Sequence, residues 1–109
     1  MSVKAVIGKF VTEADSSVQR EATKWFIYMI RASDESLYTG ITTDVKRRFS
    51  EHGSPKKGAR YFRGRQPLEI VYTEPCADRS FASRREAEIK KMSRNEKLSL
   101  IGQWNLPDE

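Results

Sequence analysis

The stretch WFIYMIRASDESLYTGI, residues 25–41, decides the fold predicted for this chain. Its first part, residues 25–31, is rich in aromatic and β-branched side chains, which is typical of a strand buried on both faces. The polar segment that follows is turn-prone, and Asp34 in it is suited to hydrogen bonding with its own backbone. Because residues 37–41 resume the strand pattern, we predict an antiparallel hairpin.

Two tyrosines and a glycine stand out in this hairpin. A turn near residues 33–34 would place Tyr28 roughly opposite Tyr38, with the two side chains about 5 Å apart on one face. Packing is the ordinary role of such a pair, and a site that uses the hydroxyl groups is the alternative. Gly40 marks a place where the backbone bends or where something approaches closely.

The pattern changes after the hairpin, because TTDVKRRFSEH, residues 42–52, predicts a helix. Thr42 or Thr43 is expected to cap its N-terminus. Arg48 and His52, the only histidine in the chain, are four residues apart and are therefore expected on one stripe of this helix. A solvated surface is the ordinary role of such a stripe, and one half of an active site is the alternative.

A glycine-rich, basic loop is predicted over residues 53–65, with Tyr61 and Phe62 near its end. These two aromatic residues either cover the end of the core or stack on an unpaired base. The alternating segment PLEIVYTE, residues 67–74, predicts a third strand. One face of this strand is expected to carry Leu68, Ile70 and Tyr72.

Two helices are expected to complete the domain, over residues 80–92 and 94–104. Glu86 falls on or beside the apolar stripe of the first of them, where a carboxylate must be paired, hydrogen-bonded or metal-bound. A salt bridge to Arg48 or Arg85 is the structural alternative to a metal site.

The predicted order of elements is β-β-α-loop-β-α-α. Three short strands with helices packed against them make an α+β domain. We assign this domain to residues 25–102 and expect Gly102 to end the last helix. Residues 1–24 are expected to form an N-terminal extension, and residues 103–109 a C-terminal tail.

The 109-residue chain has a formal net charge of +5, and the positive excess is concentrated in two segments. Residues 44–66 carry +6 and residues 79–97 carry +4. Such clusters attract phosphate backbones, although many basic helix faces are only solvated. No apolar run is long enough to span a membrane. Because Cys76 is the only cysteine and no secretory leader is evident, a reduced, cytoplasmic setting is expected.

Together, the candidate residues supply what hydrolysis of a phosphodiester bond needs. A tyrosine hydroxyl can activate the attacking water, Arg48 can bind the phosphate, and Glu86 can hold a divalent cation. A single carboxylate suits Mg²⁺, which keeps most of its waters and borrows phosphate oxygens. Since the ordinary pKa of tyrosine is about 10, a tyrosine base needs a nearby cation or a metal-bound hydroxide.

The hairpin motifs Phe26-Ile27-Tyr28 and Tyr38-Thr39-Gly40 resemble the paired motif of the GIY-YIG nuclease superfamily. Arg48 lies where this family has its catalytic arginine, and His52 matches a histidine found in many members. Glu86 matches the metal-binding glutamate of a later helix. The resemblance covers about residues 25–102, the whole predicted domain, and is nearest to the small stand-alone bacterial members, the YhbQ-like group.

This resemblance implies a three-stranded antiparallel sheet flanked by helices, with both tyrosines, Arg48 and Glu86 lining one cleft. It implies cleavage with one divalent metal ion, Mg²⁺ or Mn²⁺, in which Arg48 steadies the phosphate and one tyrosine assists the attack. His52 would assist proton transfer or bind phosphate. The chain departs from the family pattern at Phe26, in place of a glycine, and at Ile41, where many members have lysine.

The predicted function is therefore that of a metal-dependent endonuclease, with DNA favoured over RNA as substrate and selectivity for DNA structure left open. A noncatalytic nucleic-acid-binding module with the same fold is the alternative. Because such nucleases usually borrow affinity from an appended domain, a protein partner that supplies affinity is also expected. The side chains expected to bind nucleic acid are Lys46, Arg47, Lys56, Lys57, Arg60, Arg63 and Arg65.

Overall fold

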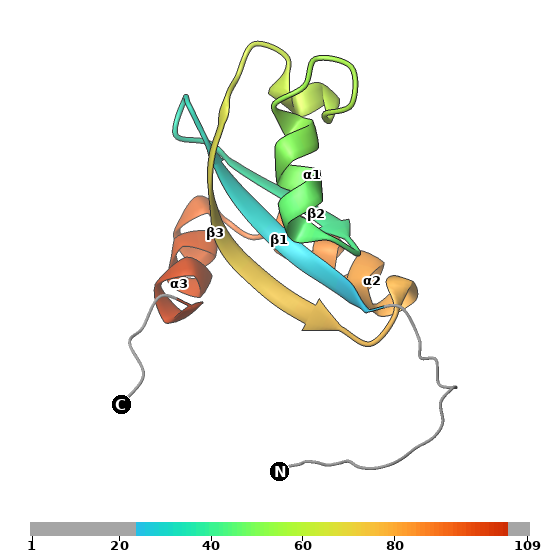
Figure 1. Cartoon of the computed structure of the whole chain (residues 1–109). Coiled ribbons are helices and arrows are strands. Elements are labelled where there is room, and N and C mark those ends of the chain that lie inside the picture. The colour runs from blue at the N-terminus through green and yellow to red at the C-terminus, as the bar shows by residue number, and fades with distance from the viewer. Residues whose placement is uncertain (1–23, 105–109) are drawn as a thin grey trace, which may run out of the picture.

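An antiparallel sheet of three strands is the centre of the computed structural model, which describes residues 24–104 (Figure 1). The strands are β1 (Trp25–Ala32), β2 (Leu37–Thr42) and β3 (Pro67–Cys76), in the spatial order β2-β1-β3. The helices are α1 (Val45–His52), the short 3-10 helix η1 (Arg60–Phe62), α2 (Arg79–Lys90) and α3 (Arg94–Trp104). The predicted α+β fold is confirmed. The predicted N-terminal extension and C-terminal tail lie almost wholly outside the described residues.

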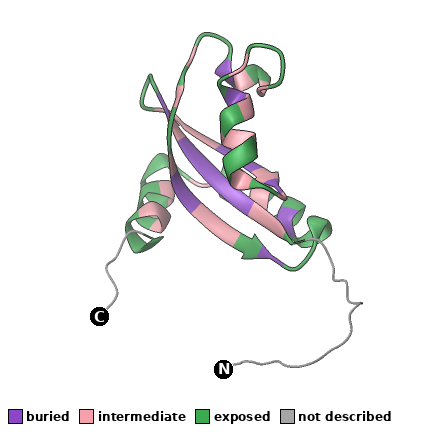
Figure 2. Ribbon diagram, in the orientation of Figure 1, coloured by how far each residue is buried: buried purple, intermediate pink, exposed green. Residues whose placement is uncertain are grey.

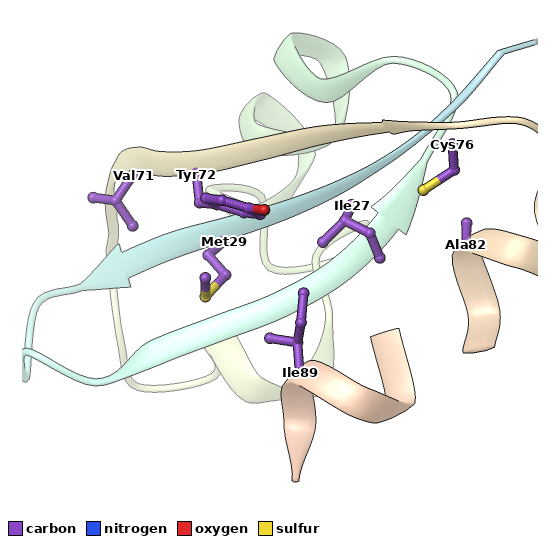
Figure 3. Close-up of a cluster of buried hydrophobic side chains, with 7 residues drawn as sticks. All are labelled: Ile27, Met29, Val71, Tyr72, Cys76, Ala82 and Ile89. Carbon is purple, nitrogen blue, oxygen red and sulfur yellow. The ribbon is translucent and has the colours of Figure 1, made fainter. Parts of the chain in front are cut away.

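Helices cover both faces of the sheet, with α1 on one face and α2 on the other (Figure 1). The side chains of strand β1 alternate between the two faces of the sheet. Because β1 is the central strand and both faces are covered, most of its side chains are buried (Figure 2). Ile27 and Met29 pack with Ala82 and Ile89 of α2 in one apolar cluster (Figure 3). Tyr28 belongs to a second cluster, on the α1 face. None of the helices within residues 24–104 is long and apolar enough to cross a membrane.

The hairpin of β1 and β2 has a different register from the predicted one. Tyr28 pairs with Gly40, and Tyr38 pairs with the residue two positions further along β1, so the two tyrosines are not opposite each other. The cause lies in the turn. Asp34 accepts a backbone N–H two residues later at 3.1 Å, as its residue type predicts, and Glu35 takes up a left-handed φ of 69°. The tyrosines still share a face, because they lie diagonally across the strand pair.

Strand β3 contains an irregularity that changes which side chains reach each face. Met29 pairs with Tyr72 and the next residue of β1 pairs with Ile70, so Val71 is an extra residue in the ladder. Val71 and Tyr72 therefore both lie in the cluster on the α2 face, whereas Ile70 packs on the α1 face. The expectation that Ile70 and Tyr72 share a face with Leu68 is wrong, and Leu68 is exposed.

The ends of two helices also differ from the prediction. Asp44, rather than Thr42 or Thr43, caps α1, because its side chain accepts a hydrogen bond at 3.0 Å from the backbone N–H three residues later. Helix α3 continues two residues past Gly102, the predicted stop. Gly102 does not adopt the left-handed conformation that ends a helix in this way, so the chain stays helical there.

Candidate active site

The centre of the candidate site is a buried hydrogen bond between a strand and a helix. The hydroxyl oxygen of Tyr28 lies 2.8 Å from Nε2 of His52. Tyr28 is in the middle of β1, and His52 is the last residue of α1, the helix that covers that face of the sheet. Only 1 % of Tyr28 and 2 % of His52 is exposed. This burial favours a role for His52 inside the protein over direct contact with a phosphate.

Five rings pack together around this hydrogen bond. The ring centroid of Tyr38 lies 6.1 Å from that of Tyr28 and 5.2 Å from that of His52. Tyr61 and Phe62 of η1 each lie 5.1 Å from Tyr38. Phe62 is buried and Tyr61 is half-buried, so both cover the end of the core, the first of their two predicted roles. We call these five residues the aromatic cluster; Tyr38 and Tyr61 are its half-buried members.

Gly40 provides the space that Tyr28 occupies. The two residues are cross-strand partners, and a Cβ atom added to Gly40 would lie 2.6 Å from the hydroxyl oxygen of Tyr28 and 2.7 Å from its Cζ. The close approach predicted at this glycine is therefore made by the tyrosine ring itself. Tyr38 and Gly40 therefore have different roles on the same strand. Tyr38 contributes its own ring to the cluster, and Gly40 leaves room for the ring of Tyr28.

Replacing Gly40 with alanine is expected to displace the ring of Tyr28 and to lower the free energy of unfolding by about 1–3 kcal/mol, the usual cost of overpacking. Chemical denaturation measures this loss. The matched control is Gly102→Ala, because a Cβ at Gly102 meets open space in a helix and is expected to stabilise it slightly. Equal stability of the two variants would contradict the account of Gly40.

Arg48 lies beside the aromatic cluster and is fixed by two contacts. Its Nη1 donates hydrogen bonds to Oε1 of Glu51 at 2.8 Å and to the backbone carbonyl of Lys57 at 2.9 Å. Burial raises the pKa of Tyr28, the neighbouring Tyr38 raises it further, and the Arg48 guanidinium lowers it. Arg48 thus supplies the nearby cation that a tyrosine hydroxyl requires if it is to lose its proton.

The imidazole of His52 is neutral at pH 7. Burial lowers its pKa to about 4, with the charge of Arg48 as a further cause. Its Nδ1 accepts a hydrogen bond from the backbone N–H of Ala59 at 3.1 Å. The loop approaches closely here, since a Cβ atom at Gly58 would lie 2.8 Å from Cα of His52. The loop that follows α1 therefore folds back over His52.

Glu86 is placed differently from the other predicted catalytic residues. It lies on α2, which packs against β1 and β2 on the face opposite α1. Its carboxylate forms an ion pair with Lys90 at 3.1 Å, and 22 % of its side chain is exposed. The predicted salt bridge to Arg48 or Arg85 is wrong, because the lysine one helical turn further on is the nearer partner. Within residues 24–104, no ion pair links Glu86 to the aromatic cluster or to Arg48.

Metal binding by the described part of the chain would have to rest on few ligands. Residues 24–104 contain no group of three or more His, Cys, Asp and Glu side chains placed to hold an ion. A closed structural zinc site is therefore absent from these residues. Glu86 can act as a single oxygen ligand, which fits a hard cation that keeps most of its waters.

The predicted nucleic-acid-binding side chains lie mainly on α1 and on the loop after it. Arg65 is half-buried and engaged within the protein: it contacts Asp34 at 2.7 Å and the carbonyl of Tyr61 at 2.9 Å, and its guanidinium lies 4.1 Å from the ring of Tyr61. A cavity of about 400 Å³ opens beside the loop and is bordered by His52 and Phe62. The exposed members of the set are Lys46, Arg47, Lys56, Lys57, Arg60 and Arg63.

Two contacts that shape the site were missed in the sequence. Glu51 holds Arg48, and the spacing of three residues between them on a helix is a signal that could have predicted this pair. The backbone amide of Ala59 holds His52, and no residue type signals that contact. Backbone donors become visible only when the path of the loop is known.

A hairpin that presents two tyrosines, followed by a helix that carries an arginine and a histidine, defines a class of nuclease-like domains. Residues 24–99 match the family model of the GIY-YIG catalytic domain, and the chain belongs to the GIY-YIG family. The family predicted from the two hairpin motifs is thus confirmed.

Among its relatives are proteins named UPF0213. The chain is 49 % identical over 87 residues to the UPF0213 protein DP2720 of Desulfotalea psychrophila, covering 77 % of this chain and 79 % of that protein. It is 46 % identical over 81 residues to the UPF0213 protein YhbQ of Escherichia coli K12, covering 74 % of this chain and 80 % of that one.

Two solution NMR structures of similar proteins share the fold. The UPF0213 protein BH0048 from Bacillus halodurans is 40 % identical, with a TM-score of 0.50 over 77 % of this chain and 88 % of that one. Protein EF2693 from E. faecalis is 31 % identical, with a TM-score of 0.54 over 81 % of this chain and 93 % of that one.

Proposed function

We propose that this chain is a metal-dependent endonuclease that hydrolyses phosphodiester bonds in DNA. The observation that carries the proposal is that Tyr28, Tyr38 and Arg48 come together on the α1 face of the sheet, in a chain that belongs to a nuclease family. A pair of tyrosine hydroxyls next to a fixed guanidinium combines a proton acceptor with a phosphate-binding cation.

Each of these residues has a role that its position supports. Of the two hairpin tyrosines, Tyr38 is half-buried and Tyr28 is buried, so the hydroxyl of Tyr38 is assigned to the attacking water. Arg48 is assigned to the phosphate. Its Nη1 already donates to two protein oxygens, which fixes the plane of the guanidinium, and the group has further N–H donors for a phosphate oxygen.

Glu86 would hold the divalent metal ion, Mg²⁺ or Mn²⁺. Its single carboxylate suits an ion that keeps several waters and shares phosphate oxygens. When bound, such an ion supplies Lewis-acid stabilisation of the charge on the phosphate. Because β2 is an edge strand, with α2 packed on one face and Tyr38 on the other, a phosphate at this edge can reach side chains from both faces.

The DNA backbone would be bound by the exposed basic side chains of α1 and its loop. Lys46 and Arg47 lie on the helix that carries Arg48, so a strand bound along this surface is led toward the aromatic cluster. Arg65 is the least available of the predicted set, because Asp34 and Tyr61 already hold it. Selectivity for DNA structure, and a protein partner that adds affinity, stay predictions.

A noncatalytic nucleic-acid-binding module is the second candidate, and one observation favours it. The carboxylate of Glu86 is paired with Lys90, and Glu86 lies on α2, on the face of the sheet opposite α1. A module of this kind would bind DNA through the same basic surface without cutting it. Its binding would weaken steeply as salt rises, because each phosphate contact releases a counterion.

A plasmid-nicking assay with the full chain separates the two candidates. Supercoiled plasmid is incubated with protein and Mg²⁺ or Mn²⁺, and the nicked and linear forms are quantified. We expect nicking that requires the metal and stops when a chelator removes it, because Glu86 alone supplies no Lewis acid. Salt-dependent binding without any metal-dependent nicking would contradict the endonuclease and support the binding module.

A further inference from the structure

The hydrogen bonds of His52 determine which of its ring nitrogens carries the proton. Nδ1 lies 3.1 Å from the backbone nitrogen of Ala59, and a backbone N–H can only donate. Nδ1 is therefore the acceptor and has no proton. A neutral imidazole then carries its proton on Nε2, the atom that lies 2.8 Å from the hydroxyl oxygen of Tyr28. It follows that His52 donates this hydrogen bond and Tyr28 accepts it.

We propose that the backbone amide of Ala59 makes His52 a positioning residue, which donates from Nε2 to Tyr28 and so turns the hydroxyl hydrogen of Tyr28 outward to the Tyr38 side. The proposal rests on the proposed function and gives His52 a role different from the proton transfer that the family resemblance implies. A nitrogen that already carries a proton cannot take another one from tyrosine. His52 therefore sets the direction of a hydrogen bond and moves no proton in the reaction.

The direction matters because it runs from the buried interior to the half-exposed tyrosine. Ala59 donates to His52, and His52 donates to Tyr28, whose own hydrogen is left for the neighbouring Tyr38. A donor placed behind Tyr38 fixes the direction of its hydroxyl group, which is assigned to the attacking water in the proposed function. Arg48 supports the same arrangement, since it lies beside Tyr28 and binds the loop that carries Ala59.

The loop is built to keep the Ala59 amide in place. The N–H of Gly58 donates to the carbonyl of Ser54 at 3.1 Å, and Gly58 itself packs against the backbone of His52. The Lys57 carbonyl accepts from Arg48 at 2.9 Å. If Nδ1 of His52 were also protonated, its N–H would face the backbone N–H of Ala59, and neither could accept. This repulsion is in accord with the lowered pKa of His52. The charged or titratable groups near the buried imidazole of His52 are Arg48 and Glu51 of α1, Tyr28 and Tyr38 of the sheet, and Arg63 and Arg65 of the loop.

Nitrogen NMR of the full chain tests the tautomer directly. His52 is the only histidine, so a uniformly ¹⁵N-labelled sample gives one set of imidazole signals. At pH 7 we expect an unprotonated Nδ1 and a protonated Nε2. A protonated Nδ1, alone or together with Nε2, would overturn the proposal. This result does not depend on whether the protein cuts DNA. It therefore tests the tautomer of His52 even if the proposed function is wrong.

Ala59→Pro removes the single N–H that the proposal invokes. The φ of Ala59 is −63°, which proline adopts without strain, and Ala59→Gly keeps the N–H as a matched control. In the proline variant we expect the pKa of His52 to rise and proton exchange between its two nitrogens to appear. The glycine variant is expected to keep the wild-type tautomer. Unchanged imidazole signals in the proline variant, with the fold retained by circular dichroism, would overturn the role of the amide.

Activity separates positioning from proton transfer. A glutamine at position 52 can still accept from Ala59 through its oxygen and donate to Tyr28 through its nitrogen, but it cannot act as an acid or base. We therefore expect His52→Gln to keep most of the nicking rate that His52→Ala loses. If His52 moves a proton, both variants lose about a hundredfold or more, and that equal loss would overturn the positioning role.

Discussion

Replacing Glu86 with alanine is expected to lower the rate of metal-dependent nicking by about a thousandfold, to background. The reason is that Glu86 is the residue assigned to hold the metal ion, and Lewis-acid stabilisation of a phosphate is worth several kcal/mol, with about 1.4 kcal/mol for each factor of ten. The same change removes only an ion pair with Lys90 on a half-exposed helix surface. Such pairs contribute roughly 0.3–0.5 kcal/mol, so the variant should remain folded.

Glu88→Ala is the matched control for Glu86→Ala. It lies on the same helix, is exposed, and also takes part in an ion pair, with Arg85 at 3.0 Å. Both variants thus lose one carboxylate and one ion pair of α2. Plasmid nicking over a range of Mn²⁺ concentrations measures the difference, and we expect only Glu86→Ala to lose the activity. Equal activity of the two variants would remove Glu86 from the site.

Arg48→Ala is expected to lower the rate of the chemical step by about a hundredfold to a thousandfold, the usual cost of removing one donor to a developing negative charge. Arg48 also lies beside Tyr28 and binds the loop that carries Ala59, so its loss also disturbs the hydrogen bonds behind Tyr38. Arg48→Lys is expected to recover only part of the rate, because an ammonium group cannot reproduce the fixed plane of the guanidinium. Single-turnover cleavage measures the chemical step apart from binding.

Arg47→Ala distinguishes a role of Arg48 in the chemical step from general electrostatic binding of DNA. Arg47 precedes Arg48 on α1 and contacts the same carboxylate, Glu51, at 3.5 Å, but its side chain is exposed. We expect Arg47→Ala to weaken DNA binding and to leave the single-turnover rate at saturating protein near that of the wild type. If Arg47→Ala and Arg48→Ala reduce the chemical step equally, Arg48 is only one of several basic contacts.

The fold was largely predictable because hydrophobic alternation and helical spacing are local properties of the sequence. The strand over residues 25–31 and the alternating third strand are examples, and both occur with slightly extended ends. The errors arose where a single residue decides the geometry. The left-handed Glu35 shifts the partner of Tyr28 by two residues, and the extra residue Val71 moves Tyr72 to the other face.

The candidate site was predictable in its membership more than in its arrangement. The residue types of Tyr28 and Arg48 suggest their chemistry, and the structure places the two side chains next to each other. The burial of His52 could not be foreseen, because it depends on a loop that folds back and brings the backbone N–H of Ala59 to within 3.1 Å of its ring. The partner of Glu86 was missed for a different reason. Lys90 lies one turn further along the same helix and needs no tertiary contact, whereas the adjacent Arg85 pairs with other carboxylates.

In the proposed site, Glu86 on one side of the sheet and the tyrosines on the other serve one metal ion at the edge strand β2. Paramagnetic broadening by Mn²⁺, followed residue by residue in NMR spectra of the full chain with a short DNA duplex bound, tests this directly. We expect the amide signals around Glu86 on α2 and around Tyr38 on β2 to broaden together, and both effects to disappear in Glu86→Ala. Broadening confined to α2, or unchanged by the substitution, would contradict it.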